Sequence, residues 1–190
     1  LARNIGYIPK SRKAARATVS FFIDTTNITP IPSSITLKKG PIASTSGSFG
    51  PQSFVYSILE DITVPIFDGI ASFDNLPIYE GTLLTSNFVY NTRNVNQRFI
   101  LPNTGIDTEL ISVNVKPNEQ STSQVTYIIQ DSLFTVKPDS KVYYLQEIEN
   151  ERYELLFGDN KFGKALEEGN YITANYIVSN GDSANGVNQF

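Results

Sequence analysis

The chain has 190 residues, of which 40% are hydrophobic and 18% are charged, and its formal net charge is −4. It contains no His, Cys, Met or Trp, which excludes disulfides, thiolate and imidazole metal sites, and every catalytic mechanism that needs histidine or cysteine. A negative net charge does not suit a nucleic-acid binder, and no apolar run approaches the roughly 20 residues of a membrane-spanning helix. Branched and aromatic residues far outnumber Ala and Leu, and this composition predicts an all-β protein.

The first sixteen residues, Leu1–Arg16, form the most helix-like and most basic stretch of the chain. Because Pro9 interrupts a helix, we expect a short helical N-terminal segment, a turn at Gly6–Pro9 and then a strand. The stretch contains five positive charges, at Arg3, Lys10, Arg12, Lys13 and Arg16. We interpret them as a solvated connector and not as a phosphate-binding arm, since no aromatic ladder accompanies them.

Strand patterns begin directly after this stretch. From Ala17 to Asp24 the residues alternate between two faces, with Ala17, Val19, Phe21 and Ile23 on one and Thr18, Ser20, Phe22 and Asp24 on the other, which predicts a strand with one buried face. Further strands are expected at Ser34–Lys38 and Phe54–Leu59, with a flexible loop at Ser44–Gly50 between them. The pair Asp68-Gly69 stands between two apolar arms and predicts a tight β-hairpin, because both residues readily take the positive φ angles of such a turn.

The second half of the chain continues the strand pattern after a turn at Glu80-Gly81. We expect a strand within Tyr79–Tyr90 and a polar loop at Asn91–Gln97. Six further strands are predicted at Phe99–Leu101, Leu110–Val115, Val125–Gln130, Val142–Glu147, Arg152–Phe157 and Ile172–Val178. About ten strands, mainly antiparallel, suggest a sandwich or a pair of small sheets. A soft boundary divides the chain into an N-terminal β region at 1-94 and a C-terminal β domain at 95-190, and a single domain stays an alternative.

One segment has the spacing of a nucleotide-binding loop. Gly158–Ala165 matches G-x-x-x-x-G-K after a predicted strand, but Ala165 stands where a Ser or Thr hydroxyl would bind Mg²⁺. The pair Gly169-Asn170 also ends any helix within about one turn. We therefore interpret the segment as a Gly-rich connection between two strands. Asp159, Lys161 and Gly163 resemble a calcium loop only faintly, because the alternating carboxylates are missing.

Acidic and aromatic residues keep a second class of function open. Four carboxylates, Glu147, Glu149, Glu151 and Glu154, could act in pairs as in glycosidases, but they cluster at a predicted hairpin tip. Five tyrosines, at 143, 144, 153, 171 and 176, could line a sugar or protein surface, although strand spacing favours core packing. The residues alone leave two classes: a structural or assembly protein, and a carbohydrate-binding or carbohydrate-processing β module. We assign no catalytic, cofactor-binding or metal-binding residue.

A series of motifs, each weak alone, occurs along the chain in a characteristic order. It comprises Ala2–Pro9 with Ala14–Ala17, Arg98–Asn103, Ile106-Asp107, Leu110–Val115, Val142–Glu147, Arg152–Asp159, Phe162–Leu166, Glu168–Asn170, Ile172–Tyr176, Asn180-Gly181 and Ala184–Gly186. In this order the motifs resemble the baseplate wedge proteins of contractile-tailed bacteriophages, within the wider baseplate J-like family. The stretch from Phe157-Gly158-Asp159 to Asn180-Gly181 is the most specific. Asn160 stands where the family often has Gly, and Asn tolerates the left-handed conformation better than most residues.

The resemblance implies a structural protein without an active site, cofactor or small-molecule substrate, of which this chain is a central fragment. Its structural signature lies in turn residues: Gly158, Asp159, Gly163, Gly169, Asn180, Gly181, Asn185 and Gly186. It further implies a scaffold subunit of the virion, assembled in the host cytoplasm and located in the tail baseplate. Such a subunit forms a homodimer within a wedge, binds other wedge and tail proteins, and makes ring contacts that rearrange on sheath contraction.

Two expectations accompany this resemblance. The alternative function is a carbohydrate-binding or carbohydrate-degrading β module of a phage tail, which would need a groove with two carboxylates and exposed tyrosine rings. If the chain is an assembly protein, we expect its interfaces at exposed apolar residues on edge strands and at the Ser44–Gly50 loop, because an unpaired edge can accept a strand from another chain.

Overall fold

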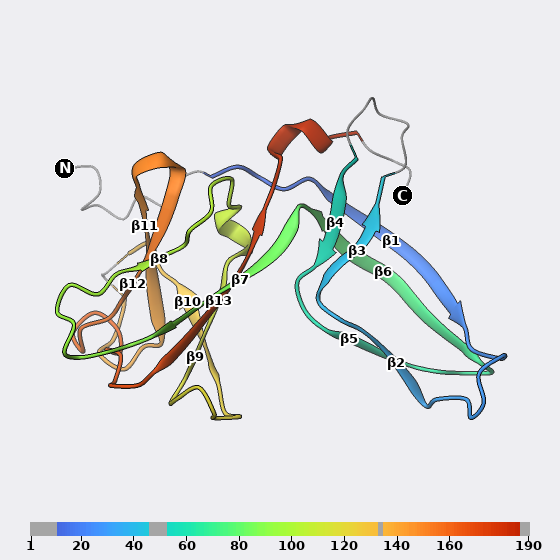
Figure 1. The fold of residues 1–190 in the computed structure, drawn as a ribbon, viewed down its shortest axis with the longest axis horizontal. Coiled ribbons are helices and arrows are strands. Elements are labelled where there is room, and N and C mark those ends of the chain that lie inside the picture. Colours follow the sequence, from blue (N-terminus) through green and yellow to red (C-terminus); the bar gives the residue numbers. More distant parts are fainter. Residues whose placement is uncertain (1–10, 46–52, 133–134, 187–190) are drawn as a thin grey trace. The chain divides into compact units, whose positions relative to one another are not determined.

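The computed structural model describes residues 11–45, 53–132 and 135–186. The all-β prediction is confirmed: thirteen strands form three sheets, and the helices in the described part are 3-10 turns of three or four residues (Figure 1). The expected helical lead-in falls on residues outside the described part. Residues 11–15 are irregular, and the first strand begins at Arg16.

The chain forms two compact units, each assembled from two segments. The seven-stranded unit comprises residues 1–12 and 84–178, and the four-stranded unit comprises residues 13–83 and 179–190. The chain therefore passes between units three times: between Arg12 and Lys13, within strand β7 (Thr82–Val89), and directly after strand β13 (Tyr171–Val178). The division at 94/95 into separately folding domains stays a prediction.

The seven-stranded unit is built on a sheet with the order β7-β13-β9-β10-β11-β12-β8. Its remaining strands are β8 (Phe99–Ile100), β9 (Ser112–Lys116), β10 (Val125–Ile129), β11 (Val142–Ile148) and β12 (Arg152–Phe157). The strands β11 and β12 form an antiparallel hairpin whose tip is the 3-10 turn η3 (Glu149–Glu151), and a second turn, η2 (Thr108–Leu110), precedes β9. The pair β10–β11 is parallel, in contrast to the antiparallel neighbours of both strands.

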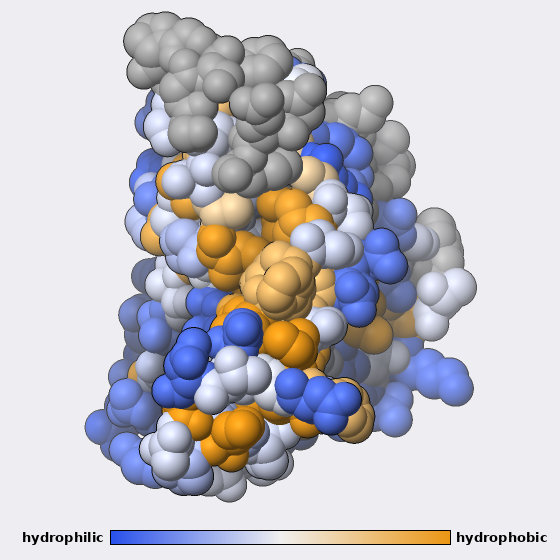
Figure 2. Space-filling model, turned by 90° about the vertical axis from the view of Figure 1, so that its right-hand side faces the viewer, coloured by the Kyte–Doolittle hydropathy of each residue, from blue (hydrophilic) through white to orange (hydrophobic). Residues whose placement is uncertain are grey.

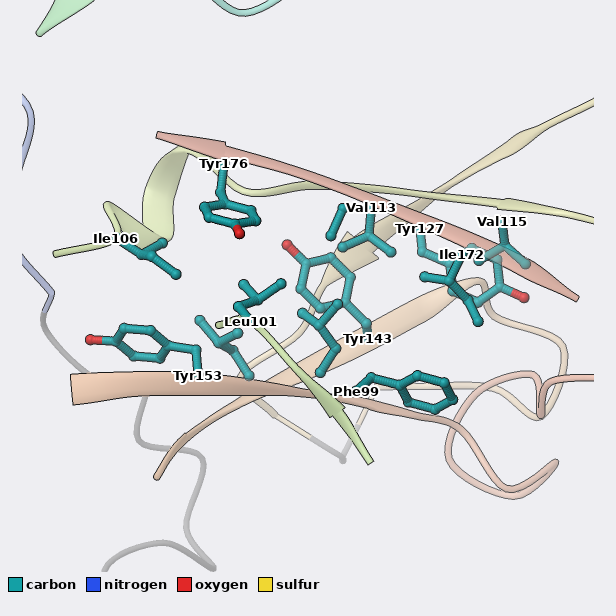
Figure 3. Packing of buried hydrophobic residues seen from close by; sticks show 13 residues of the cluster. Phe99, Leu101, Ile106, Val113, Val115, Tyr127, Tyr143, Tyr153, Ile172 and Tyr176 are labelled. Atoms are coloured by element: carbon teal, nitrogen blue, oxygen red, sulfur yellow. The ribbon is translucent and has the colours of Figure 1, made fainter. Parts of the chain in front are cut away.

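This sheet curls around its own core. The core takes side chains from strands along the whole sheet, among them Tyr127, Tyr143 and Ile172, which point toward one another or lie side by side (Figure 3). Burial raises the pKa of the Tyr143 hydroxyl. The two end strands of the sheet order also meet, because the rings of Phe88 on β7 and Phe99 on β8 pack edge to face with centroids 5.6 Å apart. Aromatic packing of this kind stabilises the closed arrangement beyond the area that it buries.

The four-stranded unit has the sheet order β1-β6-β4-β3 and a separate two-stranded ribbon of β2 and β5. Its strands are β1 (Arg16–Asp24), β2 (Ser34–Leu37), β3 (Gly40–Ser44), β4 (Val55–Ile58), β5 (Ile62–Pro65) and β6 (Ile70–Glu80). The C-terminal 3-10 turn η4 (Gly181–Ala184) belongs to the same unit, and Ala184 joins a core cluster with Tyr56 and Ile78.

The Asp68-Gly69 hairpin and strand β3 can both be compared with the sequence predictions. The hairpin at Asp68-Gly69 is confirmed: Phe67 and Ile70 exchange backbone hydrogen bonds of 3.0 and 2.8 Å, and Asp68 and Gly69 have φ angles of 50° and 78°. Strand β3 was not predicted, because Gly40 and Pro41 are typical of a turn. It forms nevertheless, since pairing with β4 satisfies the backbone and a register shift accommodates Pro41.

Candidate functional site

The segment that resembles a nucleotide-binding loop is a closed turn between β12 and β13. The Asp159 side chain accepts hydrogen bonds from the backbone N–H groups of Lys161 and Phe162, both at 2.9 Å. These hydrogen bonds, the one from Phe162 first, hold the pKa of the Asp159 carboxyl below its ordinary value. Residues 164–170 contain no helix. The carboxylate therefore occupies the N–H groups that a phosphate would need, which agrees with our interpretation of the segment as a connection.

Glycine at position 158 is required by close packing inside this turn. A Cβ atom on Gly158 would overlap the backbone of Gly163, and Gly163 itself has a φ of 97° beside the Val142 side chain. Asn160 takes a left-handed φ of 66° and accepts a hydrogen bond of 2.9 Å from the Ala165 backbone through its side-chain oxygen. Asn160 thus supplies a left-handed conformation that Gly would adopt without strain, and its side chain adds a bond that Gly lacks.

The other turn residues stand on both sides of β13. Gly169, with a φ of 81°, and Asn170 form the turn before it, where the Asn170 side-chain oxygen accepts from the Glu167 backbone at 2.9 Å. Asn180 and Gly181 follow β13, and Asn185 and Gly186 form the last described turn. Four residues of the predicted signature, Gly158, Asp159, Gly163 and Gly169, therefore shape the connection between β12 and β13, and the other four lie after β13, the last strand. None of the eight lines the pocket described below.

Sequence reasoning missed Glu80, the fully buried carboxylate at the end of β6. Its two oxygens accept hydrogen bonds from Ser179 Oγ at 2.7 Å, from Asn180 Nδ2 at 2.8 Å and from the Asn180 backbone N–H at 3.1 Å. Glu80 thereby fixes the turn after β13 from a position 100 residues earlier in the chain. The sequence of Glu80-Gly81 predicts only a turn, because no local pattern indicates that a carboxylate will be buried.

The four acidic residues considered for glycosidase chemistry do not form one group. Glu154 is buried and forms a two-pronged ion pair with Arg98, with distances of 2.9 and 2.6 Å. Glu149 lies in the exposed turn η3. Only Glu147 and Glu151 line a common pocket, of about 280 Å³.

This pocket offers little of what a sugar site needs. It is lined by Ser11, Arg12, Gly105, Ile106, Glu147, Glu151 and Tyr153. The Arg12 guanidinium stands 3.8 Å from the Glu151 carboxylate. The Tyr153 side chain is 3% exposed and belongs to the core, so it presents no ring on which a sugar could stack.

The remaining candidates are distributed as follows. Three of the five tyrosines, Tyr143, Tyr153 and Tyr176, are buried in the seven-stranded unit, as strand spacing favours. Of the basic N-terminal cluster, Arg3 and Lys10 lie outside the described residues. No three acidic side chains in the described part lie together in a way that could hold a metal ion. No described helix has the length and hydropathy to cross a membrane.

Apolar side chains on the surface form the other conspicuous feature. Figure 2 shows apolar residues gathered on one face between hydrophilic ones. Independently of that view, large apolar side chains are exposed in each unit: Phe21, Phe22, Ile28, Ile31 and Phe67 in the four-stranded unit, and Val89, Val95, Ile128, Leu156 and Phe162 in the seven-stranded unit. Phe22 and Phe67 are 68% and 73% exposed, which is unusual for side chains of this size. The expected interface loop at Ser44–Gly50 lies mostly outside the described residues.

No protein-family model matches the chain, and no curated protein matches it.

Proposed function

We propose that this chain is a structural scaffold subunit of a bacteriophage tail baseplate wedge. In this role it contacts copies of itself and other wedge and tail proteins, and it acts in the assembled virion. The observation that carries the proposal is the order of motifs along the chain, above all the stretch from Gly158 to Gly181. The turn residues of that stretch support it further, because Gly158, Asp159 and Gly163 shape a closed connection between β12 and β13 in which the Asp159 carboxylate occupies the backbone N–H groups.

The distribution of charge and apolar surface suits a protein that works through contacts. Its buried carboxylates serve the fold: Glu80 binds Ser179 and Asn180, and Glu154 binds Arg98. Large apolar side chains such as Phe22 and Phe67 lie on the surface instead. Contacts that are individually modest can break and re-form, which an assembly needs if it is to change arrangement on sheath contraction.

Location in the particle tests the proposal directly. Antibodies raised against the 190-residue chain would be applied to intact phage particles from the source of the sequence, and gold label would be located by electron microscopy. We expect label at the end of the tail distal to the capsid, before and after sheath contraction. Label confined to the capsid or to tail fibres, or none on particles whose proteins include this chain by mass spectrometry of dissociated tails, would contradict the proposal. A preimmune serum is the control.

A further inference from the structure

The two edge strands of the four-stranded sheet differ in how they are protected. Strand β3 has five residues, contains Pro41 and has a register shift between Pro41 and Ala43. Strand β1 has nine residues, contains no proline, and forms the outer edge of its sheet (Figure 1). Proline, bulges and short length are the devices by which proteins prevent an edge from pairing with another chain. Strand β3 has all of them, and β1 has none.

The β-bulge in the pairing of β1 with β6 lies on β6. Around Ser20 the pairing passes from Val19–Leu76 to Phe21–Phe73, so that β6 contributes Asp74 and Asn75 opposite one residue of β1. Asn75 takes the left-handed φ of 53°, and its backbone N–H donates to Ser20 Oγ at 2.9 Å. The bulge is thus absorbed by β6, and β1 stays continuous from Arg16 to Asp24. No other described strand of this unit pairs with its outer edge.

The side chains of β1 make this edge self-complementary. Its exposed face carries Arg16, Thr18, Ser20, Phe22 and Asp24. The two charges stand at opposite ends and have opposite sign, with Ser20 midway between them. An antiparallel pair of such strands, related by a two-fold axis at Ser20, places Arg16 of each copy opposite Asp24 of the other.

We propose that β1 is an assembly edge that pairs antiparallel with β1 of a second copy of this chain, with the two Ser20 residues opposite each other. This register pairs all nine residues of each strand and sets Thr18 opposite the exposed Phe22. A shift by two residues in either direction separates Arg16 from Asp24, and one such shift places Arg16 opposite Phe22. Opposite charges and pairs of aromatic with β-branched side chains stabilise antiparallel strands, so the side chains select this register.

The Asp24 carboxylate is suited to such a contact. The Asp24 side chain accepts from the Thr26 backbone at 2.9 Å and from Thr26 Oγ1 at 2.7 Å, and both bonds end on Oδ1. These bonds hold the pKa of the Asp24 carboxyl below its ordinary value, which keeps it ionised. The Arg16 guanidinium lies 5.6 Å from the centroid of the Tyr79 ring, at the start of the strand. Because both Thr26 bonds end on Oδ1, the other oxygen of Asp24, Oδ2, is the one that Arg16 of a second copy would approach.

The inference rests on the proposed assembly role and names one contact through which two copies of the chain would associate. Nine paired residues bury less surface than a permanent interface needs, so the dimer is expected to be weak in solution and to gain strength where several contacts act together.

Cysteine cross-linking tests the register, because the chain contains no cysteine of its own. The variant S20C places two thiols opposite each other, within the Cα separation that a disulfide spans. The matched control T18C lies on the same strand and face, but its two copies are four residues apart in this register, or about 13 Å. Under mild oxidation we expect a disulfide-linked dimer of S20C and monomeric T18C on a non-reducing gel.

A mixture of variants provides the second measurement if S20C fails to fold. T18C and F22C should each stay monomeric alone and should cross-link to each other when mixed, because the register sets these residues opposite. Equal cross-linking of S20C and T18C, or no dimer from S20C and none from the mixture, overturns the proposed pairing. Such a result would contradict the β1 pairing and leave the baseplate location standing. Gold label in another part of the particle would contradict the baseplate location and leave the β1 pairing standing.

Discussion

The two sheets differ at their end strands. In the seven-stranded sheet the end strands contact each other through Phe88 and Phe99, whereas in the four-stranded sheet the end strands β1 and β3 are separated by β6 and β4. The aromatic residues are used differently as a result. Phe99 is 7% exposed in the first unit, and Phe22 on the edge strand of the second is 68% exposed. In the first sheet the aromatic side chains of the end strands pack against each other, whereas in the second an aromatic side chain of the edge strand β1 stays exposed and can contact a neighbour. The first unit thus buries the aromatic side chain of its end strand in its own core, and the second exposes one that a neighbouring chain could cover.

The largest effect on this comparison is expected from removing the buried carboxylate of the four-stranded unit. Glu80→Ala leaves Ser179 Oγ and both donors of Asn180 without their acceptor. We expect the free energy of unfolding to fall by about 4 kcal/mol, and amide hydrogen exchange to accelerate in β6 and in residues 179–186. Glu80→Gln keeps the shape and one acceptor oxygen and should cost less. Equal exchange rates in wild type and Glu80→Ala would contradict the role of Glu80.

The matching change in the seven-stranded unit is Gly158→Ala. Its methyl group would overlap the Gly163 backbone, so we expect a loss of about 3 kcal/mol in the free energy of unfolding. Gly169→Ala is the control, since its Cβ would meet no atom within 4 Å and only the φ of 81° is unfavourable. Chemical denaturation of both variants measures the difference. Similar losses in the two would show that the turn can open at little cost.

These two residues also show how far the sequence reached. The alternation from Ala17 to Ile23 and the Asp68-Gly69 turn are local patterns, and the structure confirms the strand and the hairpin that they predict. Gly158 is recognisable as a turn residue, but its need for glycine arises from a contact with Gly163 that closes only in the folded turn. Glu80 contacts residues about 100 positions away, and no local pattern records such a partner. The sequence therefore predicts the elements, and the tertiary contacts decide which polar residues matter.

A smaller effect is expected at the Arg98–Glu154 ion pair. Arg98→Ala leaves the Glu154 carboxylate, whose side chain is 8% exposed, without its cation. Because the Arg98 side chain is half exposed, water replaces part of the interaction, and we expect the free energy of unfolding to fall by less than in Glu80→Ala or Gly158→Ala. Arg98→Lys should recover only part of it, since a lysine cannot form both bonds. Thermal unfolding monitored by circular dichroism measures both, and no loss in Arg98→Ala would show that the pair is fully solvated.

The smallest effect concerns pH. Hydrogen bonds from Phe162 and Lys161 lower the pKa of Asp159 in the folded state relative to the unfolded chain, so this group stabilises the fold above its unfolded pKa, about 4. The contribution is lost as the pH falls through the lower folded pKa. The difference in melting temperature between wild type and Asp159→Asn should therefore shrink below about pH 4. A difference that stays constant from pH 6 to pH 3 would contradict this assignment.

Self-association of charge-swapped chains tests most directly whether the four-stranded unit offers an edge to a second copy. Wild type, Arg16→Asp, Asp24→Arg and the double swap would be compared by sedimentation equilibrium at equal concentration and ionic strength. Each single change sets like charges opposite at both ends of the paired strands, which should weaken the dimer about tenfold or more. The double swap restores opposite charges with their positions exchanged, and we predict that it restores the wild-type dissociation constant. Equal association of all four chains, or a double swap as weak as the single changes, would contradict the account.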